Sequence, residues 1–263
     1  MHARGARVEP SRRHPLKRHA SLLALLALAS TAHAGGIALR WGSCEGTANR
    51  NFACDRSTGS ELLVGSFSPP PGISQLTGIE MILRITSADG TVPNWWQMFA
   101  VGSCRRSSVA MSLDMSDQTD CDDPWSGQAM GGIGSWEIDG TGANVRMEAA
   151  VAPEYAAPSR SGTTYAAFKL LINHQRSNGA GSCGGCDAPV CVKLEAIRLC
   201  QPGTLIDPNS YKYSAPTVDL TDGINGMGGA TQVATWQGGT STCSAGLSKP
   251  STWSELKARF KSR

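Results

Sequence analysis

The sequence predicts an all-β protein: an antiparallel β-sandwich or jelly roll of about ten strands, stapled by disulfides and followed by a short C-terminal helix. Three observations lead to this fold class. Apolar and polar residues alternate over many short runs. Clusters of Gly, Pro, Ser, Asp and Asn separate these runs. All nine cysteines follow an N-terminal segment that has the composition of an export signal.

That segment, residues 1–34, has the three parts of a secretory signal peptide. Residues 1–20 carry six basic residues against one acid, residues 21–30 are mostly apolar, and Ala32 and Ala34 stand where a signal peptidase reads small residues. We therefore expect the mature protein to begin at Gly35 and to be secreted or periplasmic. Residues 11–17 also resemble a twin-arginine signal, but disulfides form after export, which favours the unfolded-chain route.

Charge and motifs exclude several classes of partner and enzyme. Six of the 24 basic residues but only one of the 21 acidic residues lie in residues 1–34, so the remainder carries a net charge of −2 rather than +3. This balance argues against nucleic acid as a partner. No later run is long enough for a transmembrane segment. His174 is the only histidine after residue 34, which excludes a multi-histidine zinc site.

Alternation with a period of two predicts half-buried strands. The clearest runs are residues 79–86, 145–151, 163–173 and 190–199, and a shift of the apolar set near Ala196 indicates a β-bulge. Further strands are expected at residues 37–41, 61–67, 97–101, 109–113, 133–138 and 231–236.

Three segments are expected after the signal. Residues 35–200 should form the sandwich domain, residues 201–229 a loop-rich segment, and residues 230–263 a returning strand and a C-terminal helix. The helix is predicted from Thr252 and Glu255, which have the spacing of a capping box. We expect its apolar side to pack against the sandwich.

Disulfides are the expected state of cysteines in an exported chain. Eight are expected to pair, namely Cys44, Cys54, Cys104, Cys121, Cys183, Cys186, Cys191 and Cys243. Proximity favours the loop-closing pairs Cys44–Cys54 and Cys104–Cys121. In the cluster of residues 183–191, two cysteines should pair locally and the third should reach Cys243. Cys200 ends an apolar strand and is expected to be the unpaired thiol. The alternative for the Cys-x-x-Cys at residues 183–186 is a redox or zinc site.

Parts of the sequence resemble known secreted proteins. The segments are residues 63–67 with the proline-rich turn after them, residues 78–83, the Trp95-Trp96 pair, the cysteine cluster and the tryptophan-containing C-terminal end. Together they resemble a group of secreted bacterial proteins of uncharacterised function. The strand pattern of residues 61–200 is also similar to that of cohesin-type and carbohydrate-binding sandwiches. This resemblance implies a fold, but it transfers no catalytic or binding residue.

The pair Trp95 and Trp96 is the candidate ligand-binding feature. If the pair lies in a strand, its two side chains point to opposite faces, so at most one indole fills the core and the other is exposed. An exposed indole can stack on a sugar ring and marks an interaction site. Packing in the core or under a loop is nevertheless the favoured interpretation of the pair, and the exposed indole is the alternative.

The densest acidic stretch, residues 114–123, is the candidate metal site. Asp117, Asp120, Asp122 and Asp123 would offer the oxygen ligands that calcium prefers. Their spacing departs from the regular calcium-loop pattern, so a solvated loop is the favoured interpretation and a weak calcium site is the alternative. No other cofactor is indicated.

The sequence therefore predicts a secreted, non-catalytic binding module. The expected partner is a glycan, another cell-surface component or a cell-surface protein. Two alternatives remain. One is a hydrolase that uses paired carboxylates, because this chemistry needs neither histidine nor cysteine. The other is a structural protein of the envelope or matrix.

Overall fold

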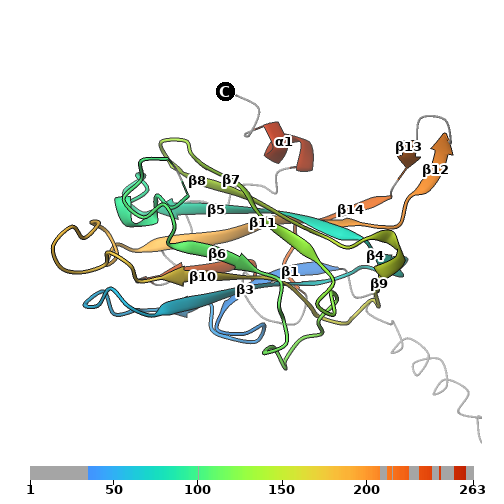
Figure 1. Ribbon diagram of the computed structural model, residues 1–263, viewed down its shortest axis with the longest axis horizontal. Helices are drawn as coiled ribbons and strands as arrows, with labels where there is room; N and C mark the ends of the chain where they lie inside the picture. The colour runs from blue at the N-terminus through green and yellow to red at the C-terminus, as the bar shows by residue number, and fades with distance from the viewer. Residues whose placement is uncertain are drawn as a thin grey trace, which may run out of the picture. The chain divides into compact units, whose positions relative to one another are not determined.

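The computed structural model describes residues 35–99, 101–207, 212–214, 216–224, 231–238, 243 and 252–258 of the chain. These residues form an all-β sandwich with one short helix and four disulfides, as the sequence predicts. Figure 1 shows the two large sheets one above the other. The predicted signal peptide, residues 1–34, lies outside the described residues.

The lower sheet in Figure 1 has four strands in the order β1-β3-β10-β6, and all of its pairs are antiparallel. Its strands are β1 (Gly36–Trp41), β3 (Ser60–Ser68), β10 (Tyr165–Asn173) and β6 (Val109–Ser112). Gly65 in the middle of β3 leaves room for a ring of β10, because an added Cβ would lie 2.1 Å from Phe168.

The upper sheet has the order β2-β15-β11-β5-β8-β7, and β14 also pairs with β11. Its strands are β2 (Asn49–Arg50), β15 (Val233–Trp236), β11 (Val190–Cys200), β5 (Gly78–Ser87), β8 (Gly142–Ala150), β7 (Met130–Ile138) and β14 (Thr217–Leu220). Only β2 and β15 pair in parallel. The register of β11 shifts between Leu194 and Ala196, which confirms the bulge expected near Ala196.

Short elements complete the described part of the chain. They are the strands β4 (Gln75–Leu76), β9 (Ala157–Pro158), β12 (Thr204–Asp207) and β13 (Lys212–Ser214), the 3-10 turns η1 (Asn94–Trp96) and η2 (Pro153–Tyr155), and the helix α1 (Trp253–Ala258). Three of the short strands, β12, β13 and β14, fall in the segment 201–229 that was expected to be loop-rich. No helix in these described ranges is long and apolar enough to cross a membrane.

The core lies between the two large sheets. Alternate residues of β5, namely Ile79, Met81, Leu83 and Ile85, are at most 2% exposed. All seven tryptophans of the chain are buried as well, with exposed fractions of 0–7%. Burial of each large apolar side chain stabilises the fold by about 1.5–3 kcal/mol. The tryptophans therefore belong to the interior, and none is left on the surface.

The disulfides join loops that are far apart in the sequence. The pairs are Cys44–Cys121, Cys54–Cys186, Cys104–Cys183 and Cys191–Cys243, with Cα–Cα distances of 5.2–6.1 Å. The expected pairs Cys44–Cys54 and Cys104–Cys121 are wrong, and so is a local pair within residues 183–191. The sandwich gathers the ends of different strands at one place, so spatial proximity overrides proximity in sequence. One cysteine of the cluster, Cys191, does bond to Cys243, as expected. Cys200 is the free thiol, which was also expected.

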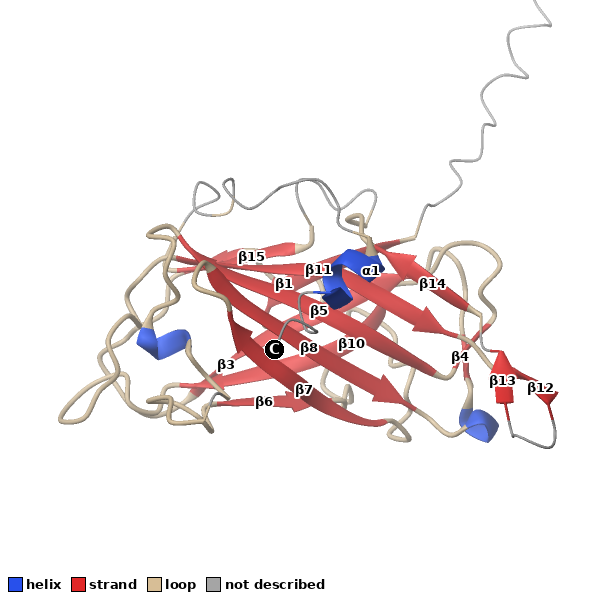
Figure 2. Ribbon diagram, turned by 90° about the horizontal axis from the view of Figure 1, so that it is seen from above, coloured by secondary structure: helices blue, strands red, loops and turns tan. Residues whose placement is uncertain are grey.

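Helix α1 begins with the expected capping box. The Thr252 backbone N–H donates to Glu255 Oε2 at 2.8 Å, and the Glu255 N–H donates to Thr252 Oγ1 at 3.3 Å. Trp253 and Leu256 pack on Ile82 and Ala196, two residues on the outer face of the upper sheet. Figure 2 shows α1 lying over β5 and β11. The helix therefore covers part of that outer face, as the amphipathic pattern predicts.

Candidate functional site

The alternative of an exposed indole at Trp95 or Trp96 is wrong, and the favoured interpretation, packing inside the fold, is confirmed. Both side chains are 0% exposed. They lie in η1, a 3-10 turn, rather than in a strand, so alternate residues do not point to opposite faces. The described part of residues 97–101 forms no named strand either. The stacking platform for a sugar ring is therefore absent at this pair.

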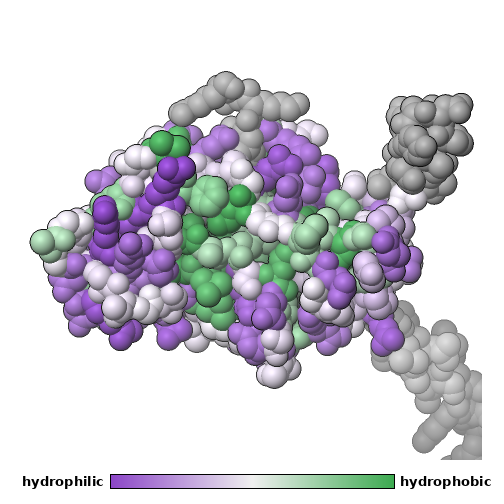
Figure 3. Space-filling view, in the orientation of Figure 1, coloured by the Kyte–Doolittle hydropathy of each residue, from purple (hydrophilic) through white to green (hydrophobic). Residues whose placement is uncertain are grey.

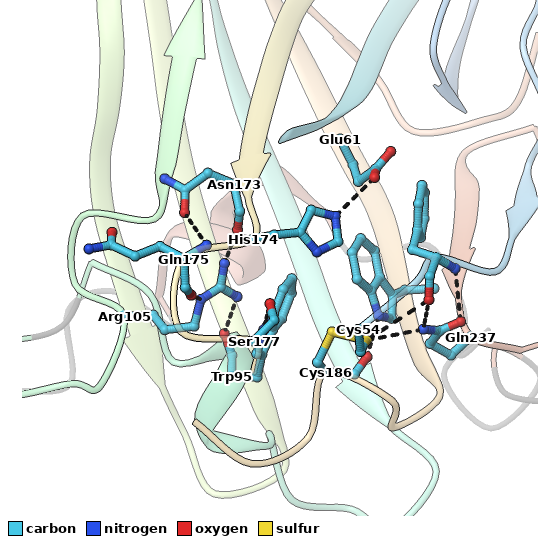
Figure 4. A network of polar contacts seen from close by, with 12 residues as sticks. Cys54, Glu61, Trp95, Arg105, Asn173, His174, Gln175, Ser177, Cys186 and Gln237 are labelled. Carbon is cyan, nitrogen blue, oxygen red and sulfur yellow. Dashed lines mark hydrogen bonds and ion pairs between the residues drawn. A yellow bond between two sulfur atoms is a disulfide. The ribbon is translucent and has the colours of Figure 1, made fainter. Parts of the chain in front are cut away.

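Trp95 belongs instead to a polar and aromatic network that joins loops (Figure 4). Arg105 is 2% exposed and donates to the backbone carbonyls of Trp95 at 2.8 Å, Gln175 at 2.9 Å and Asn173. Burial lowers the pKa of the Arg105 guanidinium to about 9.

The single histidine after residue 34 lies in the same network. His174 directly follows β10, is 0% exposed, and has its Nε2 2.9 Å from Glu61 Oε1. Its ring also lies near the Trp95 and Trp236 rings, with centroids 6.2 and 5.8 Å away. Every one of these contacts is internal to the fold, which supports a packing role for His174.

The four aspartates proposed as calcium ligands do not converge. Asp117 pairs with Lys169 at 2.5 Å, and this hydrogen bond lowers the pKa of Asp117. Asp120 accepts hydrogen bonds from the Ser43 hydroxyl and the Glu45 N–H. Asp122 and Asp123 line a separate cavity of about 320 Å³.

Asp120 lies close to two sulfur atoms, those of Cys44 and Cys121, and this is the one described group of three possible metal ligands. The two cysteines form a disulfide, so they offer no thiolate to a metal. Calcium binding in this loop remains a prediction that no observation tests.

A groove of about 1050 Å³ is the candidate functional site. It opens on the outer face of the upper sheet, where the ends of β5, β7, β8 and β11 meet. Its lining includes Met130, Glu148, Ala150, Pro153, Cys200 and Pro202. We call it the Met130 groove, because Met130 at its rim is 81% exposed.

The groove is hollow because two small residues, Gly78 and Ala150, are neighbours in one row across the sheet. Met130 pairs with Ala150, Ala150 with Gly78, and Gly78 with Cys200. Side chains of directly opposite residues point to the same face. Gly78 has no side chain and Ala150 has only a methyl group. At these two positions little projects from the outer face of the sheet, which leaves a hollow. Glycine is required at position 78, since an added Cβ would lie 2.6 Å from the Ala149 carbonyl.

Backbone hydrogen bonds close the end of the groove. The Thr77 N–H donates to the Cys200 carbonyl at 2.9 Å, and the Val151 N–H donates to the Thr77 carbonyl at 2.9 Å. The segments that leave the sheet here, residues 151–153 and 201–203, form the walls. The walls and floor are mostly apolar, which is the usual lining of a ligand site.

Two carboxylates, Glu80 and Glu148, are the only charged groups in the lining. They are directly opposite each other on β5 and β8. Arg146 Nη2 lies 3.9 Å from Glu80 Oε1 and 3.6 Å from Glu148 Oε2, which relieves their repulsion. Glu80 also lies 3.3 Å from Lys257 of α1. The Glu148 side chain remains 59% exposed.

Cys200 is the free thiol of the chain and lines the groove. Burial raises the pKa of this thiol, and the nearby Glu80 carboxylate raises it further. A raised pKa leaves little thiolate at neutral pH, so Cys200 is poorly suited to nucleophilic or metal chemistry. Cys200 therefore contributes a neutral, weakly reactive thiol to the lining of the Met130 groove.

Sequence reasoning missed this groove. Its residues come from four strands, and their register places Met130 beside Ala150 and Glu148 beside Glu80. The one signal in the sequence is the glycine-rich run at residues 131–134, which differs from the alternation elsewhere.

Comparisons with known proteins assign no function to the Met130 groove. No protein-family model and no curated protein matches the chain. Among solved structures, a cohesin module from a Clostridium perfringens family 33 glycoside hydrolase is similar with a TM-score of 0.29 and 6% identity. The match covers 73% of this chain and 98% of that chain. The likeness is too distant to support a relationship.

Proposed function

We propose that this protein is an exported, non-catalytic binding module and that the Met130 groove is its ligand site. The observation that carries the proposal is the groove itself, about 1050 Å³ of mostly apolar space on a sheet face that α1 covers only in part. Large apolar concavities with a few polar groups are typical ligand sites. Four disulfides fit the oxidising compartment that such a module would meet after export.

A protein is the partner class that the groove favours. A glycan site usually offers an exposed indole, and all seven tryptophans here are buried. The rim instead offers Met130, an unbranched side chain that adapts to apolar groups of different shapes. Ala150, Pro153 and Pro202 extend this apolar lining.

The alternative function, a hydrolase with paired carboxylates, has one observation in its favour. Glu80 and Glu148 face each other on neighbouring strands and both line the groove. Arg146 lies within 4 Å of both, however, and Glu80 also pairs with Lys257, so both carboxylates are engaged in ion pairs within the fold. The ion pairs favour the binding module.

Protein and glycan arrays would test the proposal. Ala150 is exposed on the groove floor, so Ala150→Arg should fill the groove without disturbing the core. We expect the unmodified protein to capture protein ligands, and Ala150→Arg to weaken that capture at least about tenfold. Ala110→Arg is the matched control, because Ala110 is exposed on β6 of the other sheet.

Two outcomes would contradict the proposal. Equal capture by the unmodified protein and by Ala150→Arg would show that ligands bind elsewhere. Turnover of chromogenic glycosides that Glu148→Gln abolishes would favour the hydrolase. Capture of glycans alone, lost in Ala150→Arg, would keep the groove and replace the partner class.

A further inference from the structure

β7 is an edge strand that lacks the usual protection of edges. It is the last strand of its sheet and pairs only with β8. Among the described residues, no backbone hydrogen bond joins its other side to a neighbouring strand. Residues 130–136 contain no charged residue and no proline, the residues that normally discourage pairing at an edge. The protective features of β7 are a register shift between Ile133 and Ser135 and the charged Glu137 near its end, which leave residues 130–132 open.

Two glycines leave open space along this edge. An added Cβ at Gly132 would meet no heavy atom within 4 Å, and one at Gly134 would meet only the Arg146 carbonyl, at 3.7 Å. Neither glycine has a positive φ. Neither packing nor backbone conformation therefore requires glycine here. A glycine inside a strand often marks a place where another backbone approaches.

Apolar side chains beside the edge are also only partly covered. Met111, Leu113, Ile133 and Ile138 are only partly buried against the core. Figure 3 shows hydrophobic residues gathered at the middle of the face along which β6 and β7 run in Figure 1. β6 has four residues and β7 has nine, so β6 is too short to border the whole of β7. An added strand would cover this apolar region.

Charge indicates what such a strand would carry. Gly132 pairs with Glu148, and Glu148 pairs with Glu80, all on the outer face. Neighbouring strands lie about 4.8 Å apart, so a residue added beside Gly132 would lie about 10 Å from Glu148. Gly132 has no side chain in between. A lysine or arginine side chain of the added strand could therefore reach the exposed carboxylate of Glu148.

The next outward position on the same face lies two residues along the strand, beside Met130. A side chain there would lie at the rim of the Met130 groove, whose lining is mostly apolar. Side chains on one face of a strand repeat every two residues. The groove rim and Glu148 would thus each contact one side chain of an extended segment. One is apolar, the other is basic, and one residue lies between them.

We infer that the partner of this module is an extended polypeptide segment that adds a strand to the free edge of β7. Its apolar side chain packs against Met130 at the rim of the groove, and its basic side chain pairs with Glu148. Main-chain hydrogen bonds would supply much of the affinity and the two side chains the specificity. The inference rests on the proposed function, because it takes the groove to be the ligand site.

Selection from a random peptide library displayed on phage, with the immobilised protein as target, would test the inference. We expect the selected peptides to contain an apolar residue and, two positions away, a lysine or arginine. A synthetic peptide of the commonest selected sequence would then be titrated by calorimetry. N-methylation of alternate peptide amides along one edge should weaken binding at least about tenfold, because it removes the donors of the added strand.

Two pairs of variants separate the contribution of the β7 edge to binding from that of the ion pair with Glu148. Gly132→Lys places a charged side chain on the edge and should weaken binding at least about tenfold, whereas Ala110→Lys on β6 should not. Glu148→Gln should weaken binding a few-fold and reduce its dependence on salt, because one ion pair is lost. Glu45→Gln, at an exposed carboxylate outside the groove, should change neither quantity.

The outcomes distinguish this inference from the proposed function. Loss of binding in Ala150→Arg together with full binding in Gly132→Lys would keep the groove and overturn strand addition. Full binding in both would overturn both. Failure to select any peptide, or equal binding of the N-methylated peptide, would also overturn strand addition. If the unmodified protein sediments as a dimer and Gly132→Lys as a monomer, a second copy occupies the edge and the partner is wrongly assigned.

Discussion

The guanidinium carbon of Arg105 lies 3.4 Å from the centroid of the Trp95 ring, and Nη1 of the same side chain donates to the Trp95 backbone carbonyl at 2.8 Å. Trp95 Nε1 in turn donates to Ser177 Oγ at 2.8 Å. Next to Arg105, Cys104 is bonded to Cys183. One buried cation thus joins the loop after β5 to the loop after β10. These contacts all hold loops together. The cluster therefore stabilises the fold rather than binding a ligand.

Arg105→Met should lower the free energy of unfolding by about 3 kcal/mol or more, because it leaves three backbone carbonyls without their donor. Methionine keeps much of the apolar volume, so the loss reports mainly on hydrogen bonds. Urea denaturation followed by tryptophan fluorescence measures it. The exposed neighbour Arg106 is the control, and Arg106→Met should change stability by less than about 0.5 kcal/mol. Equal effects of the two substitutions would contradict this account.

Non-reducing peptide mapping should recover the four pairs seen in the structure and one free thiol, at Cys200. Joint replacement of Cys104 and Cys183 by alanine should lower the free energy of unfolding by about 2–5 kcal/mol, since that bridge closes a long loop. Cys200→Ala removes a cysteine without removing a bridge, so its effect should be clearly smaller. A Cys44–Cys54 or Cys104–Cys121 peptide would show that the strand ends meet differently.

The sequence predicts the fold class because each strand carries its own evidence. The alternation from Ile79 to Ile85 requires only that one face of β5 be buried, whatever its neighbours are. The capping box at Thr252 and the bulge near Ala196 are equally local. Features of this kind can be predicted without knowing how the strands pair.

Features that depend on pairing could not be predicted. Cys44 is ten positions from Cys54 but bonds to Cys121, 77 positions away, because two loops meet at one end of the sandwich. The Met130 groove likewise needs the register that puts Gly78 next to Ala150. The strand-based alternative of an exposed indole at Trp95 or Trp96 is wrong for another reason. A 3-10 turn of three residues has too short a pattern to be distinguished from a strand.

Acid should weaken the turn between β7 and β8. Burial tends to raise the pKa of Asp139 in this turn, but the hydrogen bond and charge of Arg84, with the Thr141 N–H, hold it well below its usual value. The folded-state pKa is therefore lower than that of the unfolded chain. The contribution to stability is present above about pH 4 and is lost as the pH falls further, where the unfolded chain binds more protons.

Asp139→Asn should accordingly reduce stability at neutral pH by about 1 kcal/mol and flatten its pH dependence below about pH 4. The expected loss of stability is modest because the Asp139 side chain is 41% exposed and solvent screens its ion pair with Arg84. Thermal unfolding measured across this pH range checks it. Asp89→Asn, in the exposed turn after β5, should leave the profile unchanged. A profile that Asp139→Asn does not alter would mean that the Arg84 pair contributes nothing.

Two adjacent glycines of β7 should respond in opposite ways to the same substitution. A Cβ at Gly131 would lie 2.0 Å from the Glu148 carbonyl oxygen, which is backbone of β8 and has no freedom to rotate away. Gly131→Ala should therefore push β7 from β8 and lower the free energy of unfolding by about 2 kcal/mol or more. A Cβ at Gly132 would meet nothing, so Gly132→Ala should be neutral or stabilise the fold by about 0.4–1 kcal/mol, because alanine restricts the unfolded chain. Denaturant unfolding of the two variants measures both effects. Destabilisation by Gly132→Ala would mean that this glycine serves the fold, and the open edge of β7 would then have a structural explanation in place of a functional one.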